Sequence, residues 1–192
     1  MAARDGMADL ISQLRSMVDD SGSAYFTDDR LQVILDNSRL DFFHQGLTIQ
    51  DQQIDGTVVY KIYQAPYQNL EGSATGAAAW RLHDSQGTAL TSDLSIDFLR
   101  GIITFDNDQK GSARYLDGRA YDLNYAASQA WREMAGKVAA YYNFTIENRS
   151  YTRAQWYDHC MALADNFENE STLPGVGGGA SWAEYERGDF LP

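Results

Sequence analysis

Cysteine is almost absent from this 192-residue sequence, and so are apolar runs long enough to span a membrane. The single cysteine, Cys160, excludes an intrachain disulfide. The first residues, MAARDGMADL, have no apolar segment of the kind found in secretory signals, and Met1 to Gly6 is expected to be a loose leader. We therefore expect a soluble protein, made in a cytoplasm, with one core or one core plus an inserted subdomain.

Basic residues are scarce as well. Lysine and arginine number 15 against 27 acidic residues, which gives a formal net charge of −12. Phosphate backbones are bound by basic side chains that release counterions, so tight binding to nucleic acid or to an anionic membrane is disfavoured. An acidic surface repels DNA that moves past it, although many acidic surfaces serve only solubility.

Catalytic signatures are missing too: the sequence has no P-loop, no HExxH and no nucleophile elbow. The Asp106–Gly111 run, followed by Asp117, resembles the start of a calcium loop. Lys110 stands where a ligand belongs, however, and the last ligand is aspartate instead of glutamate. A hairpin turn is the better interpretation of this segment.

The histidines and the cysteine do not form a metal-binding pattern. Asp158, His159 and Cys160 are consecutive on an expected helix, where side chains point about 100° apart and do not converge on one ion. His44 and His83 are isolated, with no ligand spacing around either. We expect no catalytic, cofactor-binding or metal-binding residues.

The clearest pattern lies between residues 121 and 170, which predict two amphipathic helices joined by a short polar connection. Apolar residues from Leu123 to Tyr142 recur at helical spacing, and alanines on the same helix would let a partner approach closely. In the second helix, Thr152 and Gln155 have capping-box spacing. Its predicted buried stripe consists of Trp156, Cys160, Leu163 and Phe167.

Two further helices are expected near the N-terminus. The first is marked by apolar residues between Leu10 and Val18. The second begins at the N-cap Thr27 and is expected to end near Gly46. Its predicted buried face consists of Leu31, Ile34, Leu35 and Phe42.

Between the helical segments the period changes to two, which predicts strands. The expected strands cover residues 57–63, 79–83, 94–98, 102–105 and 112–116, with a hairpin turn at Leu99–Gly101. The predicted fold is therefore α+β: a mainly helical frame with an inserted small antiparallel sheet or sandwich and an extended C-terminal tail. The expected divisions are helices in 1–46, the β insertion in 47–117, the helical pair in 118–170 and a tail in 171–192.

The tail begins with Pro174 and a glycine run, which stop a helix and predict a tether. Aromatic and apolar residues follow the glycines. Such a segment either folds back or docks on another chain, since tyrosine and tryptophan are favoured interface anchors. The candidate docking residues are Trp182, Tyr185, Phe190 and Leu191.

Four segments, taken in order, resemble the head-tail connector (adaptor) proteins of tailed bacteriophages. The first is MADLISQLRSMVDD followed by FTDDRLQVILDNSRLDFF, and the second is the hairpin SIDFLRGIITFD. The third is RAYDLNYAASQAWREMAGKVAAYY, where Tyr-Asp-Leu starts an alanine-rich helix, and the fourth is SYTRAQWYDHCMALADNF. Together they cover nearly the whole chain up to the tail, which lies outside the resemblance from Gly175 onward.

The resemblance implies a structural virion protein without enzymatic activity or cofactor, located in the neck at the head-tail interface. Such proteins form a twelve-subunit ring beneath the portal, extend the DNA channel and give neck, stopper or tail-terminator proteins a docking surface. DNA would pass through without specific binding. By analogy, the tail would dock on the portal or on an adjacent copy.

Two other functions remain open from the residues alone. One is a glycan- or ligand-binding β-module of a virion tail component, with Tyr60, Tyr63, Tyr67 and Trp80 as an exposed stacking platform. Ordinary strand packing explains the same residues. The other is a virion-associated hydrolase using paired acids, for which the sequence singles out no residue.

Overall fold

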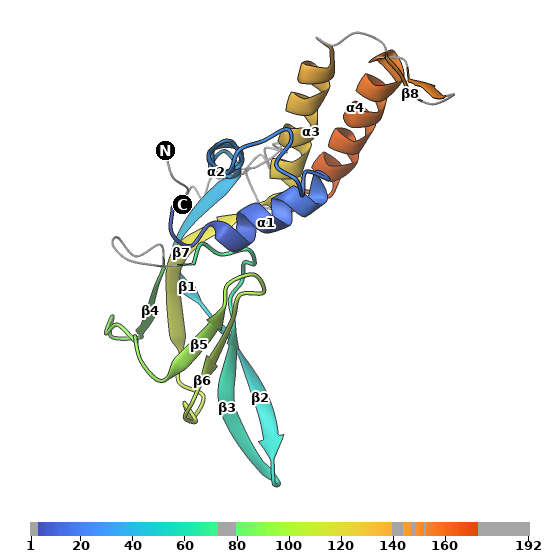
Figure 1. Cartoon of the computed structure of the whole chain (residues 1–192). Coiled ribbons are helices and arrows are strands. Elements are labelled where there is room, and N and C mark those ends of the chain that lie inside the picture. The colour runs from blue at the N-terminus through green and yellow to red at the C-terminus, as the bar shows by residue number, and fades with distance from the viewer. Residues whose placement is uncertain (1–3, 73–79, 140–143, 147–148, 152, 173–192) are drawn as a thin grey trace, which may run out of the picture.

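The computed structural model describes residues 4–72, 80–139, 144–146, 149–151 and 153–172. Over these residues it is a small α+β structure with four helices and two antiparallel sheets (Figure 1). Helix accounts for about 34% and strand for about 30%, so the expected mainly helical frame is wrong. The elements are α1 (Ala8–Met17), α2 (Asp28–Asp36), β1 (Arg39–Gly46), β2 (Thr48–Ile54), β3 (Thr57–Gln64), β4 (Arg81–Asp84), β5 (Leu94–Asp97), β6 (Ile102–Phe105), β7 (Arg114–Tyr121), α3 (Leu123–Ala139), β8 (Phe144–Ile146), β9 (Arg149–Tyr151) and α4 (Arg153–Asn169).

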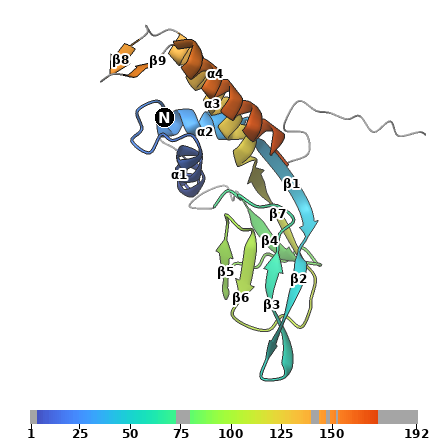
Figure 2. The same cartoon turned by 90° about the vertical axis from the view of Figure 1, so that its right-hand side faces the viewer.

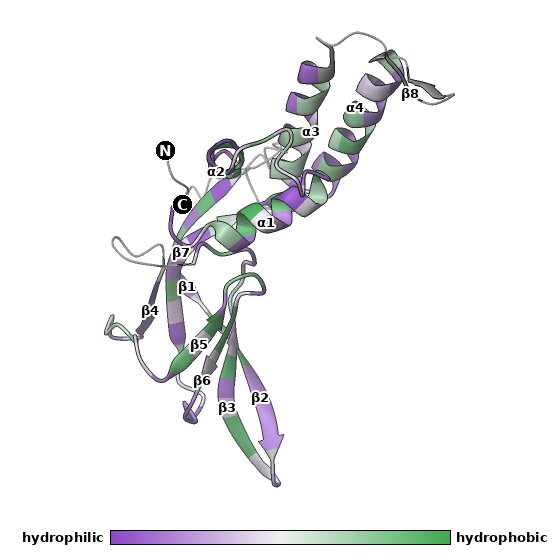
Figure 3. Cartoon of the chain, in the orientation of Figure 1, coloured by the Kyte–Doolittle hydropathy of each residue, from purple (hydrophilic) through white to green (hydrophobic). Residues whose placement is uncertain are grey.

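The two sheets have the strand orders β1-β7-β4 and β2-β3-β6-β5, while β8 and β9 form a separate small hairpin. The β2–β3 hairpin turns at Asp55 and Gly56, with φ of 49° and 77°. Both values are left-handed, as a type I′ turn requires, and Asp-Gly is a favoured pair for it. Beyond the sheet this hairpin extends as an arm whose β2 strand is mostly hydrophilic (Figures 1 and 3).

Residues 39–46 form a strand, and our prediction of a helix continuing to Gly46 is wrong. Helix α2 ends at Asp36. Phe42 is buried in the β1–β7 sheet, opposite Gly118, instead of on a helix face. A bulge between Phe42 and Gln45, together with an exposed Phe43, breaks the period-two pattern that would have marked β1 in the sequence.

The remaining helix predictions are confirmed. Thr27 caps α2 by accepting a hydrogen bond from the Arg30 backbone N–H at 3.2 Å. Helices α3 and α4 pack along each other, with Cys160 buried and the other three residues of the predicted stripe half-buried. Thr152, from the predicted capping box, lies outside the described residues. The β8–β9 hairpin between the two helices was not predicted.

Strand predictions are confirmed for β3, β4, β5 and β6, and the segment from Ser112 belongs to a longer strand, β7. The alternation along β7 is weak in the sequence because Gly118 and Ala120 occupy its inward positions. An added Cβ at Gly118 would lie 2.9 Å from the Phe42 ring, so the small residue leaves room for that ring.

Buried side chains form two clusters. One lies among the four helices and includes Leu14, Leu31 and Trp131, while the other lies between the two sheets and includes Tyr63 and Leu116. Tyr121, the last residue of β7, belongs to the helical cluster. The helical and sheet layers therefore meet at the end of β7, as the side view also shows (Figure 2).

The small-residue face of α3 gives a test of the helical layer. Ala130 is fully buried, whereas Ala162 on α4 is exposed. Ala130→Leu should lower the free energy of unfolding by about 2 kcal/mol, because extra methylenes in a packed core force side chains and backbone apart. Ala162→Leu, the matched control, should change it by less than about 0.5 kcal/mol in urea unfolding. Equal effects would show that α3 does not pack as described.

Candidate functional site

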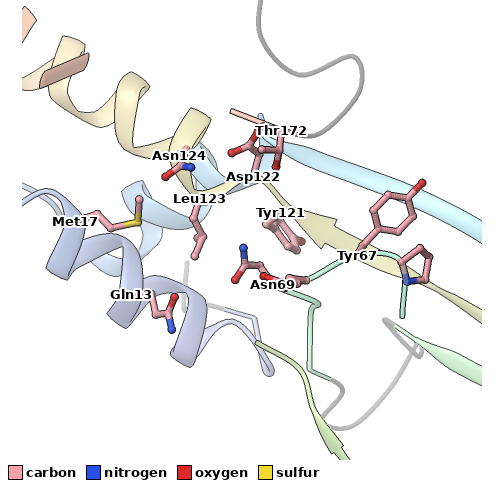
Figure 4. Close-up of a pocket in the computed structure, with 11 residues that line it drawn as sticks. Gln13, Met17, Tyr67, Asn69, Tyr121, Asp122, Leu123, Asn124 and Thr172 are labelled. Carbon is pink, nitrogen blue, oxygen red and sulfur yellow. Dashed lines mark hydrogen bonds between the residues drawn. The ribbon is translucent and has the colours of Figure 1, made fainter. Parts of the chain in front are cut away.

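A pocket of about 640 Å³ lies where the helical and sheet layers meet (Figure 4). Helix α1 contributes Gln13 and Met17 on one side, and the segment after β3, residues 66–69, contributes the opposite side. The end of β7 and the start of α3 complete the wall with residues 121–124. Thr172, the last described residue, also lines the pocket.

Asp122 fixes the rim of this pocket. One carboxylate oxygen accepts a hydrogen bond from the Tyr125 backbone N–H at 2.9 Å, which caps the start of α3. The other oxygen accepts from the Thr172 backbone N–H at 3.1 Å and from the Ser171 hydroxyl. A single buried side chain therefore ties the end of the α4 segment to the beginning of α3.

A buried polar network lies behind the wall of the pocket and includes the Tyr121 side chain. Glu71 is 2% exposed, and its carboxylate accepts a hydrogen bond from the Tyr121 hydroxyl at 2.5 Å. Arg4 Nε lies 3.2 Å from the same carboxylate, and Arg119 Nη1 lies 3.4 Å from it. Arg4 also forms a two-pronged ion pair with Asp36, at 2.6 and 2.8 Å.

Because Arg4 connects α2, the Glu71 segment and β7, the expectation of a loose leader is wrong for residues 4–6. Gly6 shows the same close attachment. Its φ is +85°, and its carbonyl accepts a hydrogen bond from the Gly72 N–H at 3.2 Å. An added Cβ at Gly6 would lie 1.5 Å from the Gly72 oxygen, so only glycine fits there.

The contacts of Glu71 stabilise the fold, and the lining of the pocket is suited to binding a ligand. Glu71 is surrounded by a hydroxyl and two guanidinium groups that all donate to it, so its carboxylate is held as an acceptor. The pocket itself is lined by amides, two phenols, a thioether and aliphatic groups, with Asp122 already engaged by three donors. Such a lining favours an uncharged, partly apolar ligand.

The Tyr121–Glu71 contact predicts a loss of stability in alkali. Burial, the hydrogen bond to Glu71 and the charge of that carboxylate raise the pKa of Tyr121, against a smaller opposing effect of Arg4. The tyrosine phenol of the unfolded chain titrates at about pH 10, so it loses its proton at a lower pH than the folded one. The contribution of Tyr121 is therefore complete below about pH 10 and is lost as the pH rises above it.

Tyr121→Phe should lower the free energy of unfolding at neutral pH by about 2 kcal/mol, the range for a hydrogen bond to a charged group. The variant should also show a smaller further decrease in the free energy of unfolding between about pH 9 and 11, measured by urea unfolding. Burial raises the pKa of Tyr63 as well, so part of the alkaline loss should remain. Tyr25→Phe, at an exposed phenol, is the control. An alkaline loss unchanged in Tyr121→Phe would contradict the assignment.

A cluster of side chains around the β1 bulge was not predicted from the sequence. The His44 ring stacks on Tyr115 at 4.2 Å and lies 5.2 Å from the His83 ring, measured between centroids. Asp117 accepts a hydrogen bond from the His44 backbone N–H at 2.6 Å and lies 3.4 Å from His83 Nε2. Burial raises the pKa of Asp117, but these two contacts, together with the charges of His83 and Arg81, outweigh burial and leave the pKa below its usual value.

Only the pairing of β7 with both β1 and β4 brings these residues together, since they are far apart in the chain. No spacing in the sequence signals them. Among the described residues, no group of three or more histidine, cysteine or acidic side chains is placed to hold a metal ion. The cluster stabilises the bulge, where His44 has a left-handed φ of 51°.

The other candidate sites are placed as follows. Asp108, in the calcium-like run, accepts hydrogen bonds from the backbone N–H groups of Tyr60 and Lys110 and so closes a turn. Cys160 is buried, which raises the pKa of its thiol, while His159 beside it is exposed.

The proposed aromatic stacking platform is not an exposed row of rings. Tyr63 is fully buried and donates a hydrogen bond from its hydroxyl to the Ser112 carbonyl at 2.8 Å. Tyr67 packs against Phe42, and Trp80 against Phe98. The candidate docking residues of the tail, Trp182, Tyr185, Phe190 and Leu191, lie outside the described residues.

No protein-family model matches this chain, and neither a curated protein nor a solved structure matches it. Within the part of the chain that the structure describes, no helix has the length and apolar character needed to cross a lipid bilayer.

Proposed function

We propose that this protein is a structural connector of a tailed-bacteriophage virion, which forms a ring beneath the portal and extends the DNA channel. The order of the four sequence segments supports this proposal. The observation that carries it is the shape of the subunit: two arms extend from opposite ends of the shared core (Figures 1 and 2). One arm is the α3–α4 pair with its β8–β9 hairpin, and the other is the β2–β3 hairpin.

The β2–β3 arm has few partners within the described chain. Among the described strands, β2 pairs with β3 alone, and β3 pairs with β6 only through residues 62–64. Tyr60 on β3 is hydrogen-bonded to Asp108 and Gln109, but beyond it the hairpin presents two strand edges within the described residues, and Val58 there is 46% exposed. An element with free edges gains hydrogen bonds and burial when a neighbour packs on it. In a closed ring every subunit both offers and receives such a contact.

The charge distribution suits a passage for DNA. The formal net charge is −12, and exposed aspartates occur on both sheets and on the hairpin arm, including Asp51 and Asp55. A wall of this sign repels the phosphate backbone, so DNA moves along it without sequence-specific binding. The partners in this proposal are the portal, neighbouring copies in a dodecameric ring as in the resembled family, and a neck, stopper or tail-terminator protein. All of them belong to the virion neck.

Negative-stain electron microscopy of the protein, alone and mixed with purified portal from the same phage, tests the proposal. We expect rings seated on the narrow end of the portal, with a DNA-wide central opening. Native mass spectrometry of the same mixture gives the copy number. A monomer that leaves the portal unchanged, or absence of the protein from purified virions, would contradict the connector role.

A further inference from the structure

We infer that the pocket at the helix–sheet junction is the docking site for residues 173–192 of the same chain, with Trp182 as the side chain that enters it. The described pocket, the position of Thr172 and the sequence after it support this inference, which is independent of the connector role. If that role is correct, the pocket would keep the tail covered until a portal or neighbouring subunit takes it.

The position of Thr172 provides the first argument. This residue lines the pocket, and its backbone N–H is held by Asp122 at 3.1 Å. The tail therefore leaves the described chain at the pocket rim. Trp182 lies ten residues further on, beyond the glycines between 175 and 179. A glycine-rich chain of that length has a root-mean-square span of about 18 Å, which allows a return to the same rim.

The short connection also favours the chain's own tail over a separate peptide as the occupant of the pocket. A short tether converts binding into an intramolecular step, with an effective concentration in the millimolar range. A weak pocket can therefore be occupied by its own tail at protein concentrations where a separate peptide would not bind.

The chemistry of the lining provides the second argument. Met17, Pro66, Tyr67 and Leu123 give apolar and aromatic surface, against which an indole ring packs well. Carboxamides are interspersed among them, and they offer acceptors for an indole N–H; they belong to Gln13, Gln68, Asn69 and Asn124.

The same lining disfavours charged ligands. None of the described residues that line the pocket is lysine or arginine, so a phosphate or carboxylate group would find no cation among them. The one carboxylate, on Asp122, already accepts hydrogen bonds from three donors. An amphipathic neutral side chain such as that of Trp182 is what the pocket fits.

Disulfide trapping in the full-length chain tests the inference. In a Cys160→Ala background, Gln68→Cys places a thiol on the exposed pocket rim, and Ala183→Cys places one beside Trp182. We expect this pair to oxidise at least about tenfold faster than a control pair of Ser95→Cys and Ala183→Cys, because effective concentration falls with distance. Ser95 is exposed on β5, away from the pocket. Adding Trp182→Ala should remove the rate advantage.

Three results would overturn the inference: equal rates for the two pairs, a rate that Trp182→Ala leaves unchanged, or cross-links only between separate chains. The last is detected by mixing the two single-cysteine variants, and it would place the tail on a neighbouring copy. These outcomes are separate from the test of the connector role, because trapping needs no portal. Rings on the portal with no trapping would retain the connector and reject only the pocket assignment.

Discussion

Gly101→Ala should lower the free energy of unfolding by about 3 kcal/mol or more, because a left-handed backbone and a steric clash coincide at this residue. Its φ is +67°, and an added Cβ would lie 2.3 Å from the Tyr67 carbonyl oxygen. The backbone there cannot move away cheaply, since the Ala65 N–H donates to the Gly101 oxygen at 2.8 Å. Urea unfolding followed by circular dichroism measures the change.

Gly56→Ala is the matched control, because it isolates the cost of the left-handed backbone. Gly56 has φ of +77°, but an added Cβ there meets nothing within 4 Å. This variant should lose only about 1 kcal/mol, the cost of placing alanine in a left-handed conformation. If the two variants lost similar amounts of unfolding free energy, the turn at Gly101 would relax away from Tyr67. The close packing of this turn against residues 65–67 would then not contribute to stability.

The turn at Gly101 also shows which parts of the fold were predictable. Residues 99–101 were expected to join two strands because a glycine follows one apolar alternating run and precedes another. The structure confirms that hairpin as β5 and β6. The helical pair α3–α4 was predicted for a similar reason: its apolar period extends over many residues, and a long pattern is more informative than a short one.

Strands β1 and β7 were predicted less well because their signals are local and conflicting. In β1, the bulge shifts the alternation after Phe42, and the apolar residues before it continue the helical period of α2. In β7, the inward positions 118 and 120 are occupied by the small residues Gly118 and Ala120. The sequence therefore lacks the large apolar residues that would mark a buried strand face. Tertiary packing decided both segments, and this made the fold less helical than expected.

The candidate pocket could not be predicted from the sequence because its wall comes from four separate segments. Asp122 stood out only as part of the Tyr-Asp-Leu start of a helix, and nothing in the sequence linked it to Thr172. The Arg4–Glu71 contact joins residues 67 positions apart. Such pairs become visible only when the end of β7 brings the helices onto the sheets.

Glu71→Ala is the other change for which we expect a large effect, again a loss of about 3 kcal/mol. Glu71 is 2% exposed, and removing its carboxylate leaves the buried Tyr121 hydroxyl without its acceptor. Two guanidinium groups, on Arg4 and Arg119, also lose their shared counter-charge. A buried charge network is costly to break from one side, because the remaining polar groups stay desolvated.

Glu168→Ala provides a control with the same change of residue in a more exposed ion pair. Glu168 pairs with Arg132, and both side chains are about one-third exposed. Exposed pairs contribute little, so this variant should lose less than about 1 kcal/mol. If Glu71→Ala lost no more than Glu168→Ala, the network would not hold the helical layer to the sheets. A loss several times larger would place the main attachment of the two layers at Glu71, next to the pocket in which we place the tail.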